Sequence, residues 1–237
     1  MSDNVNWSFR RGAAAGLAAA SLVLAGCSSS SHGNATGPAA TPTPTSGPAA
    51  IALARSAMHG IHSYAFRLLV QQTGKHPSVL SASGVVQAPS KLSGEFTVGG
   101  STVRVLAGPN GEFVQLPGKK WQREPNASVH PLQWDKVLAG VGDSQIARGT
   151  GTAAWRITAH PSARLAPALA LSATPSFTIK DLQVTIELDG SYRVVRLEAL
   201  ATGTDAGAKA TIHETVSATG YDAQKPLPDQ PATGGSA

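Results

Sequence analysis

The stretch FTIKDLQVTIEL, residues Phe177–Leu188, decides the fold of this 237-residue chain. From position 182 onward, every second residue is aliphatic and the residues between them are polar. Because successive side chains of a strand point to opposite faces, this pattern predicts a strand with one buried and one solvent-facing side. The aliphatic residues of this strand are Leu182, Val184, Ile186 and Leu188.

Strands of the same one-sided kind lie on both sides of this stretch. The pair Asp189-Gly190 is a hairpin signal that leads into two further predicted strands, and Gly99-Gly100 is a second hairpin signal upstream. The short connections predict antiparallel pairing, since parallel strands need a long crossover. Besides 177–188, the predicted strands are residues 64–71, 79–87, 92–98, 102–107, 112–116, 155–159, 192–201 and 209–219.

Three helical segments are predicted to cover the apolar side of these strands. The first begins at Pro48 and ends at Gly60, with an apolar stripe at helical spacing. The second spans residues 131–141, and the third is a short helix over 165–171 that Pro167 interrupts. The fold class is therefore α+β, with an antiparallel sheet that is apolar and covered on one face and wet on the other.

The N-terminal segment has the pattern of a secretory signal. Arg10 and Arg11 precede an apolar run from Ala13 to Leu24, which is too short for a transmembrane helix of roughly 20 apolar residues. Cys27 is the single cysteine of the chain, so it cannot form an intramolecular disulfide. The four residues before and at this cysteine, Leu24, Ala25, Gly26 and Cys27, resemble the bacterial lipobox.

The lipobox resemblance implies diacylglyceryl transfer to the Cys27 thiol, cleavage before Cys27 and acylation of the new amine. Two or three acyl chains anchor a protein stably, so we expect a domain on the extracytoplasmic face of the cell membrane. Residues 1–26 are the expected signal peptide, and 27–48 a lipidated Ser/Thr/Pro-rich tether. The folded domain is expected over 49–221, and residues 222–237 form an expected disordered tail.

Charge and composition exclude one class of partner. Removal of residues 1–26 takes away Arg10, Arg11 and Asp3, so the formal charge falls from +5 to +4 and is spread along the chain. Binding of nucleic acid requires clustered Lys and Arg with aromatic residues for stacking, and neither occurs. We expect a monomer that does not bind nucleic acid.

Two stretches carry a resemblance to a known family. Gly111–Trp121, GEFVQLPGKKW, and Gly151–Thr158, GTAAWRIT, resemble segments of actinobacterial lipoproteins of the LppX and LprG kind. The order of elements from Ala49 to Tyr221 is also similar. These lipoproteins have a LolA-like fold, which implies a strongly curved antiparallel half-barrel whose concave apolar face is covered by helices. The resemblance also implies binding of the acyl chains of a lipid or glycolipid.

The candidate binding residues are apolar positions of the predicted strands and two tryptophans. Small aliphatic residues outnumber aromatic ones, which suits a hollow interior but equally a tightly packed one. A hollow favours a lipid carrier; a packed interior favours an interaction or sensor module for a transporter, a kinase or a cell-wall enzyme. The expected walls are Tyr64, Phe66, Leu68, Val103, Val105, Leu182, Val184 and Ile186, and the expected mouth is Trp121 and Trp134.

Signatures of enzyme chemistry are weak in this sequence. Gly142-Asp143-Ser144 is similar to the nucleophile block of GDSL-type lipases, but none of the seven histidines follows an Asp by three residues, as that class requires. No Gly-x-Ser-x-Gly elbow occurs. His59 and His62 have no third metal ligand nearby in the sequence, and a helix C-terminus also favours histidine. We therefore expect no catalysis, no metal and no cofactor.

Overall fold

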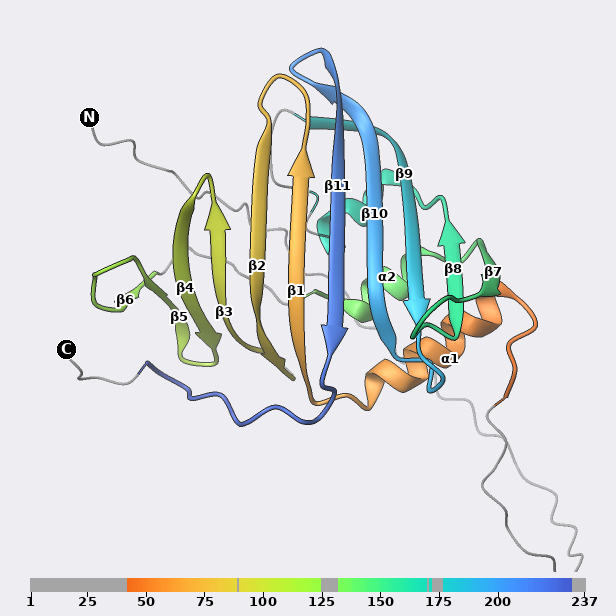
Figure 1. The fold of residues 1–237 in the computed structure, drawn as a ribbon, viewed down its shortest axis with the longest axis horizontal. Helices are drawn as coiled ribbons and strands as arrows, with labels where there is room; N and C mark the ends of the chain where they lie inside the picture. The colour runs from red at the N-terminus through yellow and green to blue at the C-terminus, as the bar shows by residue number, and fades with distance from the viewer. Residues whose placement is uncertain (1–41, 89, 125–131, 170, 172–176, 232–237) are drawn as a thin grey trace, which may run out of the picture. The chain divides into compact units, whose positions relative to one another are not determined.

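The structure is a computed structural model that describes residues 42–88, 90–124, 132–169, 171 and 177–231. The described chain from Pro44 onward is an α+β unit built on one antiparallel sheet of eleven strands. Their order is β6-β5-β4-β3-β2-β1-β11-β10-β9-β8-β7 (Figure 1). The sheet is open and not strongly curled, so the strong curvature expected from the family resemblance is not a feature of this structure.

The elements lie close to the predicted ranges. Helix α1 (Gly47–His59) is capped by the Ser46 hydroxyl, which accepts a hydrogen bond from Ala49 N, and has Pro48 in its first turn. The N-terminal meander comprises β1 (Ser63–Gln72), β2 (Ser78–Gln87), β3 (Lys91–Val98), β4 (Ser101–Gly108), β5 (Gly111–Gln115) and β6 (Gln122–Arg123). The remaining elements are α2 (Trp134–Gly140), β7 (Ser144–Arg148), β8 (Trp155–Ala159), η1 (Ala163–Ala168), β9 (Phe177–Leu188), β10 (Val194–Asp205) and β11 (Ala208–Thr219).

Five local features differ from the predictions. Strand β7 and the two-residue strand β6 were not predicted, and α2 is shorter than residues 131–141, whose first position lies outside the described residues. The segment predicted as a helix over 165–171 is a 3-10 helix over Ala163–Ala168, which tolerates Pro167. The turn after β9 is longer than Asp189-Gly190, because the Asp189 carboxylate accepts hydrogen bonds from Ser191 N and Arg193 N.

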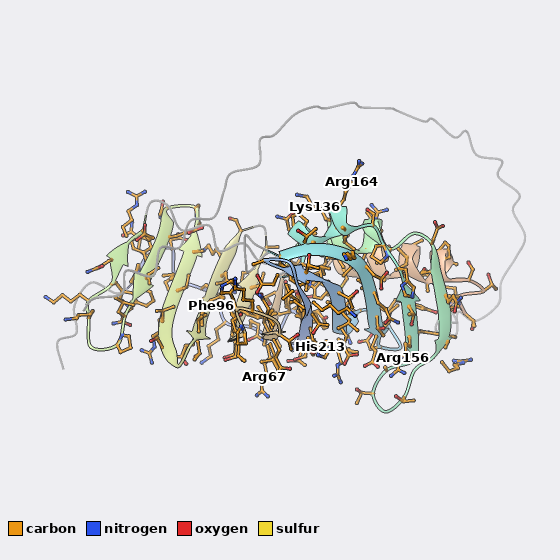
Figure 2. All side chains as sticks on the ribbon, turned by 90° about the horizontal axis from the view of Figure 1, so that it is seen from above. Arg67, Phe96, Lys136, Arg156, Arg164 and His213 are labelled. Atoms are coloured by element: carbon orange, nitrogen blue, oxygen red, sulfur yellow. The ribbon has the colours of Figure 1, made fainter. Side chains whose placement is uncertain are left out.

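The register of the strands separates two faces of the sheet. On β1, Tyr64 and Phe66 share a face, and the pairings with β2 and β11 extend this face to Val86 and Ala218. We call this side the apolar face; Tyr64 contacts Trp134 of α2 there, at 6.3 Å between ring centroids. The opposite side is the polar face. In Figure 2, Lys136 and Arg164 lie on the helix side, and Arg67, His213 and Arg156 lie on the other.

The helices cover only part of the apolar face. Helix α1 contacts β7 and β8, η1 contacts β9, and α2 packs against α1 and η1. In Figure 1 both α-helices lie behind the half of the sheet from β11 to β7, and no described helix overlies β2–β5. The buried core therefore extends under the helices, and the apolar face continues past them.

The segment after Asp222 is held along one end of β1–β3 rather than free. Asp222 Oδ1 accepts hydrogen bonds from His62 N and Ser63 N. Gln87 donates to Lys225 O and accepts from Leu227 N, and Lys91 Nζ donates to Leu227 O. The expected disordered tail is thus docked over its first part, and residues 232–237 lie outside the described residues.

A pair of glycines brings β2 and β3 close together. Gly84 faces Gly94 across the strands, and a Cβ atom on Gly84 would lie 2.1 Å from Ser93 O and 2.6 Å from Gly94 Cα. Both obstacles are backbone atoms, so a side chain could be fitted only by moving the strands apart. The ring of Phe66 covers this position, with its Cε1 3.0 Å from the same point.

Replacement of Gly84 by alanine should therefore destabilise the domain. We expect Gly84→Ala to lower the free energy of unfolding by about 1–3 kcal/mol, the usual cost of overpacking. The matched control is Gly142→Ala, where an added Cβ meets no atom within 4 Å. Urea unfolding of both variants checks the prediction, and equal midpoints would contradict it.

Candidate functional site

The candidate site is the part of the apolar face that continues onto β2–β5. One row of facing residues runs from Leu68 on β1 through Ala82 and Phe96 to Val103 on β4. The next row runs from Phe66 through Gly84 and Gly94 to Val105 and Val114. Since facing residues of neighbouring strands lie about 5 Å apart, these rows form a continuous apolar surface. We call it the open apolar face, and its half-buried members are Leu68, Leu80, Phe96, Val103 and Val114.

The shape of this surface follows from its glycines. Between Phe66 and Val105 the second row has two positions without side chains, Gly84 and Gly94. The rings of Phe66 and Phe96 lie beside them, 6.5 Å apart and tilted by 50°. The Phe66 ring packs over Gly84, and Phe66 and Val105 are themselves buried, so the accessible part of this face is formed by its half-buried members.

The structure places the predicted wall residues on one face but in two environments. Tyr64, Phe66, Leu68, Val103 and Val105 lie on β1 and β4, at or beside the open apolar face. Leu182, Val184 and Ile186 lie on β9 under the helices and are at most 1% exposed. The second group belongs to the packed core, whereas the first group includes half-buried side chains.

The two tryptophans expected at a mouth lie apart. Trp134 begins α2 and is only 7% exposed, packed against Tyr64. Trp121 is half-buried immediately before β6. Sequence reasoning missed three residues of this face, Leu80, Phe96 and Val114. A signal for Phe96 was present in the hairpin at Gly99-Gly100: both glycines have positive φ, and the hairpin sets the register that pairs Phe96 with Val103.

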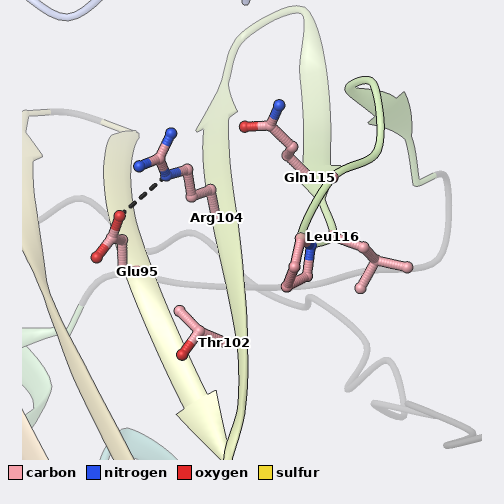
Figure 3. A pocket seen from close by; sticks show the side chains of 7 residues that line it. Glu95, Thr102, Arg104, Gln115 and Leu116 are labelled. Atoms are coloured by element: carbon pink, nitrogen blue, oxygen red, sulfur yellow. Dashed lines mark hydrogen bonds and ion pairs between the residues drawn. The ribbon is translucent and has the colours of Figure 1, made fainter.

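Two surface depressions lie away from these residues. One, of about 350 Å³, is on the polar face and contains the ion pair of Arg104 with Glu95, at 2.9 Å (Figure 3). The other, of about 400 Å³, lies between the docked C-terminal segment and β1–β3 and includes His62 and Lys91. Neither is lined by a predicted wall residue. The exposed Arg104–Glu95 pair contributes at most about 1 kcal/mol and provides no arrangement for chemistry.

Among the described residues, those considered for catalysis or metal binding lack the partners that such chemistry requires. Ser144 Oγ is buried without a hydrogen-bond partner among the described residues, close to Gly47 of α1. The histidine that a serine nucleophile needs is therefore not hydrogen-bonded to it. In the part of the chain that the structure describes, no cluster of three or more His, Cys, Asp or Glu could hold a metal, His59 and His62 included.

The predicted signal peptide and the predicted lipid-attachment site lie outside the described residues. Cys27 and the preceding Leu24, Ala25 and Gly26 are not among the described residues. Within residues 42–231, apart from the gaps given above, no helix combines the length and the hydrophobicity needed to cross a bilayer.

No known family model matches the chain, and no curated protein matches it. Among solved structures, LprF from Mycobacterium bovis matches with a TM-score of 0.56 and 13% identity, over 79% of this chain and 97% of that one. The lipoprotein LppX from Mycobacterium tuberculosis has a TM-score of 0.49 and 22% identity, over 78% and 98% of the two chains. The chain therefore shares the fold of LprF, and the predicted resemblance to actinobacterial lipoproteins of the LppX and LprG kind is confirmed at the level of the fold.

A tyrosine pair joins the open apolar face to the helix-covered core. The rings of Tyr64 and Tyr221 lie 6.1 Å apart, and the Tyr221 hydroxyl donates to Val194 O. Burial raises the pKa of Tyr64 to about 12, and the neighbouring Trp134 side chain only partly opposes this. Burial also raises the pKa of Tyr221, with smaller contributions in the same direction from Tyr64 and Asp189.

These pKa shifts predict a loss of stability at alkaline pH. Above pH 10 the unfolded chain loses the Tyr64 proton while the folded chain keeps it up to about pH 12. Because the folded state then binds more protons, stability falls as pH rises through this window, by up to about 1.4 kcal/mol per pH unit for one such group. The Tyr64→Phe variant should show a shallower fall in urea midpoint between pH 9 and pH 11.5. An identical pH dependence in both proteins would contradict the assignment.

Proposed function

We propose that this chain is a lipid-anchored extracytoplasmic protein that binds acyl chains of a lipid or glycolipid, without catalysis. The observation that carries the proposal is the open apolar face, where the core surface continues past the helices onto β2–β5. Half-buried side chains of this face, such as Phe96 and Val103, retain apolar area that an acyl chain could cover. The shared fold with LprF agrees with the proposal, and LppX is described as a lipoprotein.

The acyl chain would lie against the half-buried side chains of this face, among them Phe96 and Val103. Burial of hydrocarbon contributes about 0.8 kcal/mol per CH₂ group, so ten methylenes supply about 8 kcal/mol against an association cost of about 4–15 kcal/mol. Tight binding therefore requires a longer acyl chain.

A second candidate function is an interaction or sensor module for a transporter, a kinase or a cell-wall enzyme. The observation that favours it is a group of exposed aliphatic side chains on the polar face, at Leu69, Val79 and Leu200. The two functions use opposite faces of the sheet and are compatible in one protein.

Native mass spectrometry tests acyl binding on the protein purified from its host in mild detergent. We expect co-purifying lipid and uptake of a fluorescent fatty acid. Val103→Asp should weaken that uptake at least tenfold, because a carboxylate in an apolar site costs well over 1.4 kcal/mol. The matched control is Thr102→Asp, since Thr102 is equally half-buried and faces the polar side of the same strand.

Two outcomes would refute the acyl-binding proposal. One is a wild-type protein that is uniformly free of lipid and takes up no fatty acid. The other is an equal loss of uptake in the Val103 and Thr102 variants, both shown by urea unfolding to be folded.

The anchor is tested separately at Cys27. Given a conventional cleavable signal, the Cys27→Ala protein should appear in the soluble extracytoplasmic fraction, folded and still able to take up fatty acid. The reason is that Cys27 lies about twenty residues of Ser/Thr/Pro-rich sequence before α1. Quantitative retention of this variant in membranes washed with high salt would show that the anchor lies elsewhere.

A further inference from the structure

The turn between β5 and β6 combines exposed apolar and basic side chains. Its sequence over residues 116–121 is LPGKKW. Leu116 is 48% exposed, Lys119 and Lys120 are exposed, and Trp121 is half-buried. We call these four residues the basic tip. In Figure 1 the tip lies at the β6 edge of the sheet, whereas α1 contacts β7 and β8 at the opposite edge.

The basic tip is held in an ordered turn. Lys119 N donates a hydrogen bond to Leu116 O at 3.0 Å, and Pro117 and Gly118 occupy the two central positions. Gly118 has a φ of +67°, which together with Pro117 fits a type II turn. The Gln115 side chain also donates to Lys119 O, at 3.0 Å. Since this backbone is already ordered, contact with a partner costs little conformational entropy.

Strand pairing places the tryptophan beside this turn. β5 pairs with β6 through Val114 opposite Gln122. Continuing this register by one position puts Trp121 opposite Gln115, the residue before Leu116. The leucine and the tryptophan of the tip therefore lie on the two arms of one hairpin, within one residue of facing each other.

The two lysines of the tip have no acidic partner. Neither Lys119 nor Lys120 forms an ion pair with a described residue. Glu95, which lines the depression next to the turn, is already paired with Arg104 at 2.9 Å (Figure 3). The hairpin between β3 and β4, at the same end of the sheet, contains no charged residue over positions 98–101.

The acidic residues of β5 and β6 lie at the other end of these strands. Glu124 N donates to Glu112 O there, and Arg123 donates to Asn110 O. Four residues of strand separate Glu112 from Leu116, which is about 13 Å. This exceeds the Debye length of about 8 Å at physiological ionic strength. The basic tip therefore keeps a local positive charge.

We propose that the basic tip contacts the surface of an anionic membrane. Lysines are attracted to anionic lipid headgroups, and leucine and tryptophan are the side chains that enter the headgroup region beside them. Each lysine near such a surface strengthens binding about fivefold, so the tip alone binds weakly. If the chain is anchored as proposed above, the tether keeps the tip close to the bilayer, and a weak contact is then sufficient.

Other occupants fit the basic tip less well. A stable protein interface buries roughly 800 Å² per partner, far more than a turn of six residues offers, whereas a bilayer requires no matching shape. In a symmetric dimer formed through the tip, the lysines of one copy would meet those of the other.

The position of the tip also bears on acyl binding. β5, which ends at the tip, carries Val114 of the open apolar face, and β4 beside it carries Val103. Membrane contact would therefore bring this end of the open apolar face close to the bilayer, where acyl chains are found. This consequence rests on the proposed function, whereas the membrane contact itself does not.

Photo-crosslinking on vesicles tests the membrane contact. The full-length protein from its host carries a benzophenone side chain in place of Pro117, which is exposed in the turn. On vesicles of phosphatidylcholine mixed with anionic phosphatidylglycerol we expect a lipid adduct, and on phosphatidylcholine alone a much weaker one. In about 1 M NaCl, where the Debye length is about 3 Å, the adduct should be lost. The same group at Ser56, exposed on α1, is the position control.

Substitutions then assign the adduct to the basic tip. Joint replacement Lys119→Gln and Lys120→Gln should reduce it at least tenfold, because two charges are lost, and replacement of both by arginine should retain it. Leu116→Ser should reduce it at least threefold, because less apolar area is buried. The charge-matched control is Lys180→Gln with Lys209→Gln, at exposed positions of β9 and β11, which should leave it unchanged.

Several results would overturn the proposal. They are a Pro117 signal no stronger than that at Ser56, equal adducts on the two kinds of vesicle, an adduct mainly with a second copy of the chain, and an adduct that survives loss of both lysines. Every variant should keep its urea midpoint and its fatty-acid uptake, which separates this proposal from the acyl-binding one. Acylation at Cys27 changes only the local concentration of the tip at the surface, so the expected differences hold with or without it.

Discussion

The stability of the domain depends on strands that are apolar on one face and polar on the other. Alternation places aliphatic side chains on the same face of ten neighbouring strands, from β5 to β7, and this surface must be removed from water for the domain to be stable. The helices α1, α2 and η1 meet that requirement over β7–β9 and the neighbouring strands. Because these helices are short, they leave β2–β5 without a described helical cover, and the candidate site is a direct consequence of this shortfall.

Much of the fold could be predicted from local pattern. The predicted ranges of β8 and β9 agree with the structure, since β8 alternates throughout and β9 alternates from Leu182 onward. β7 was missed because Ile146 is its single large apolar residue, as befits a strand at the edge of a sheet. The docked segment after Asp222 could not be foreseen, since its Pro-rich sequence is held by Gln87 and Lys91, residues far away in the chain.

The candidate site was predictable only in part. Alternation correctly placed Phe66, Val103 and Leu182 on one face, but it could not tell which would lie under a helix. That distinction depends on where α1 and α2 pack, which is decided by tertiary contacts such as Tyr64 with Trp134.

That strand order also has a consequence for how the chain folds. β1–β6 form one meander and β7–β11 another, each made of antiparallel pairs of consecutive strands, and within the sheet they are joined by the single pair β1–β11. The residues of that pair are about 150 positions apart, so its closure carries the largest loop entropy of any strand pair in the sheet. The two meanders can therefore form early and independently, while the sheet becomes continuous only after β11, the last strand, has been delivered. A nascent or translocating chain thus exposes two unjoined strand edges, at β1 and at β10, until almost its entire length is free.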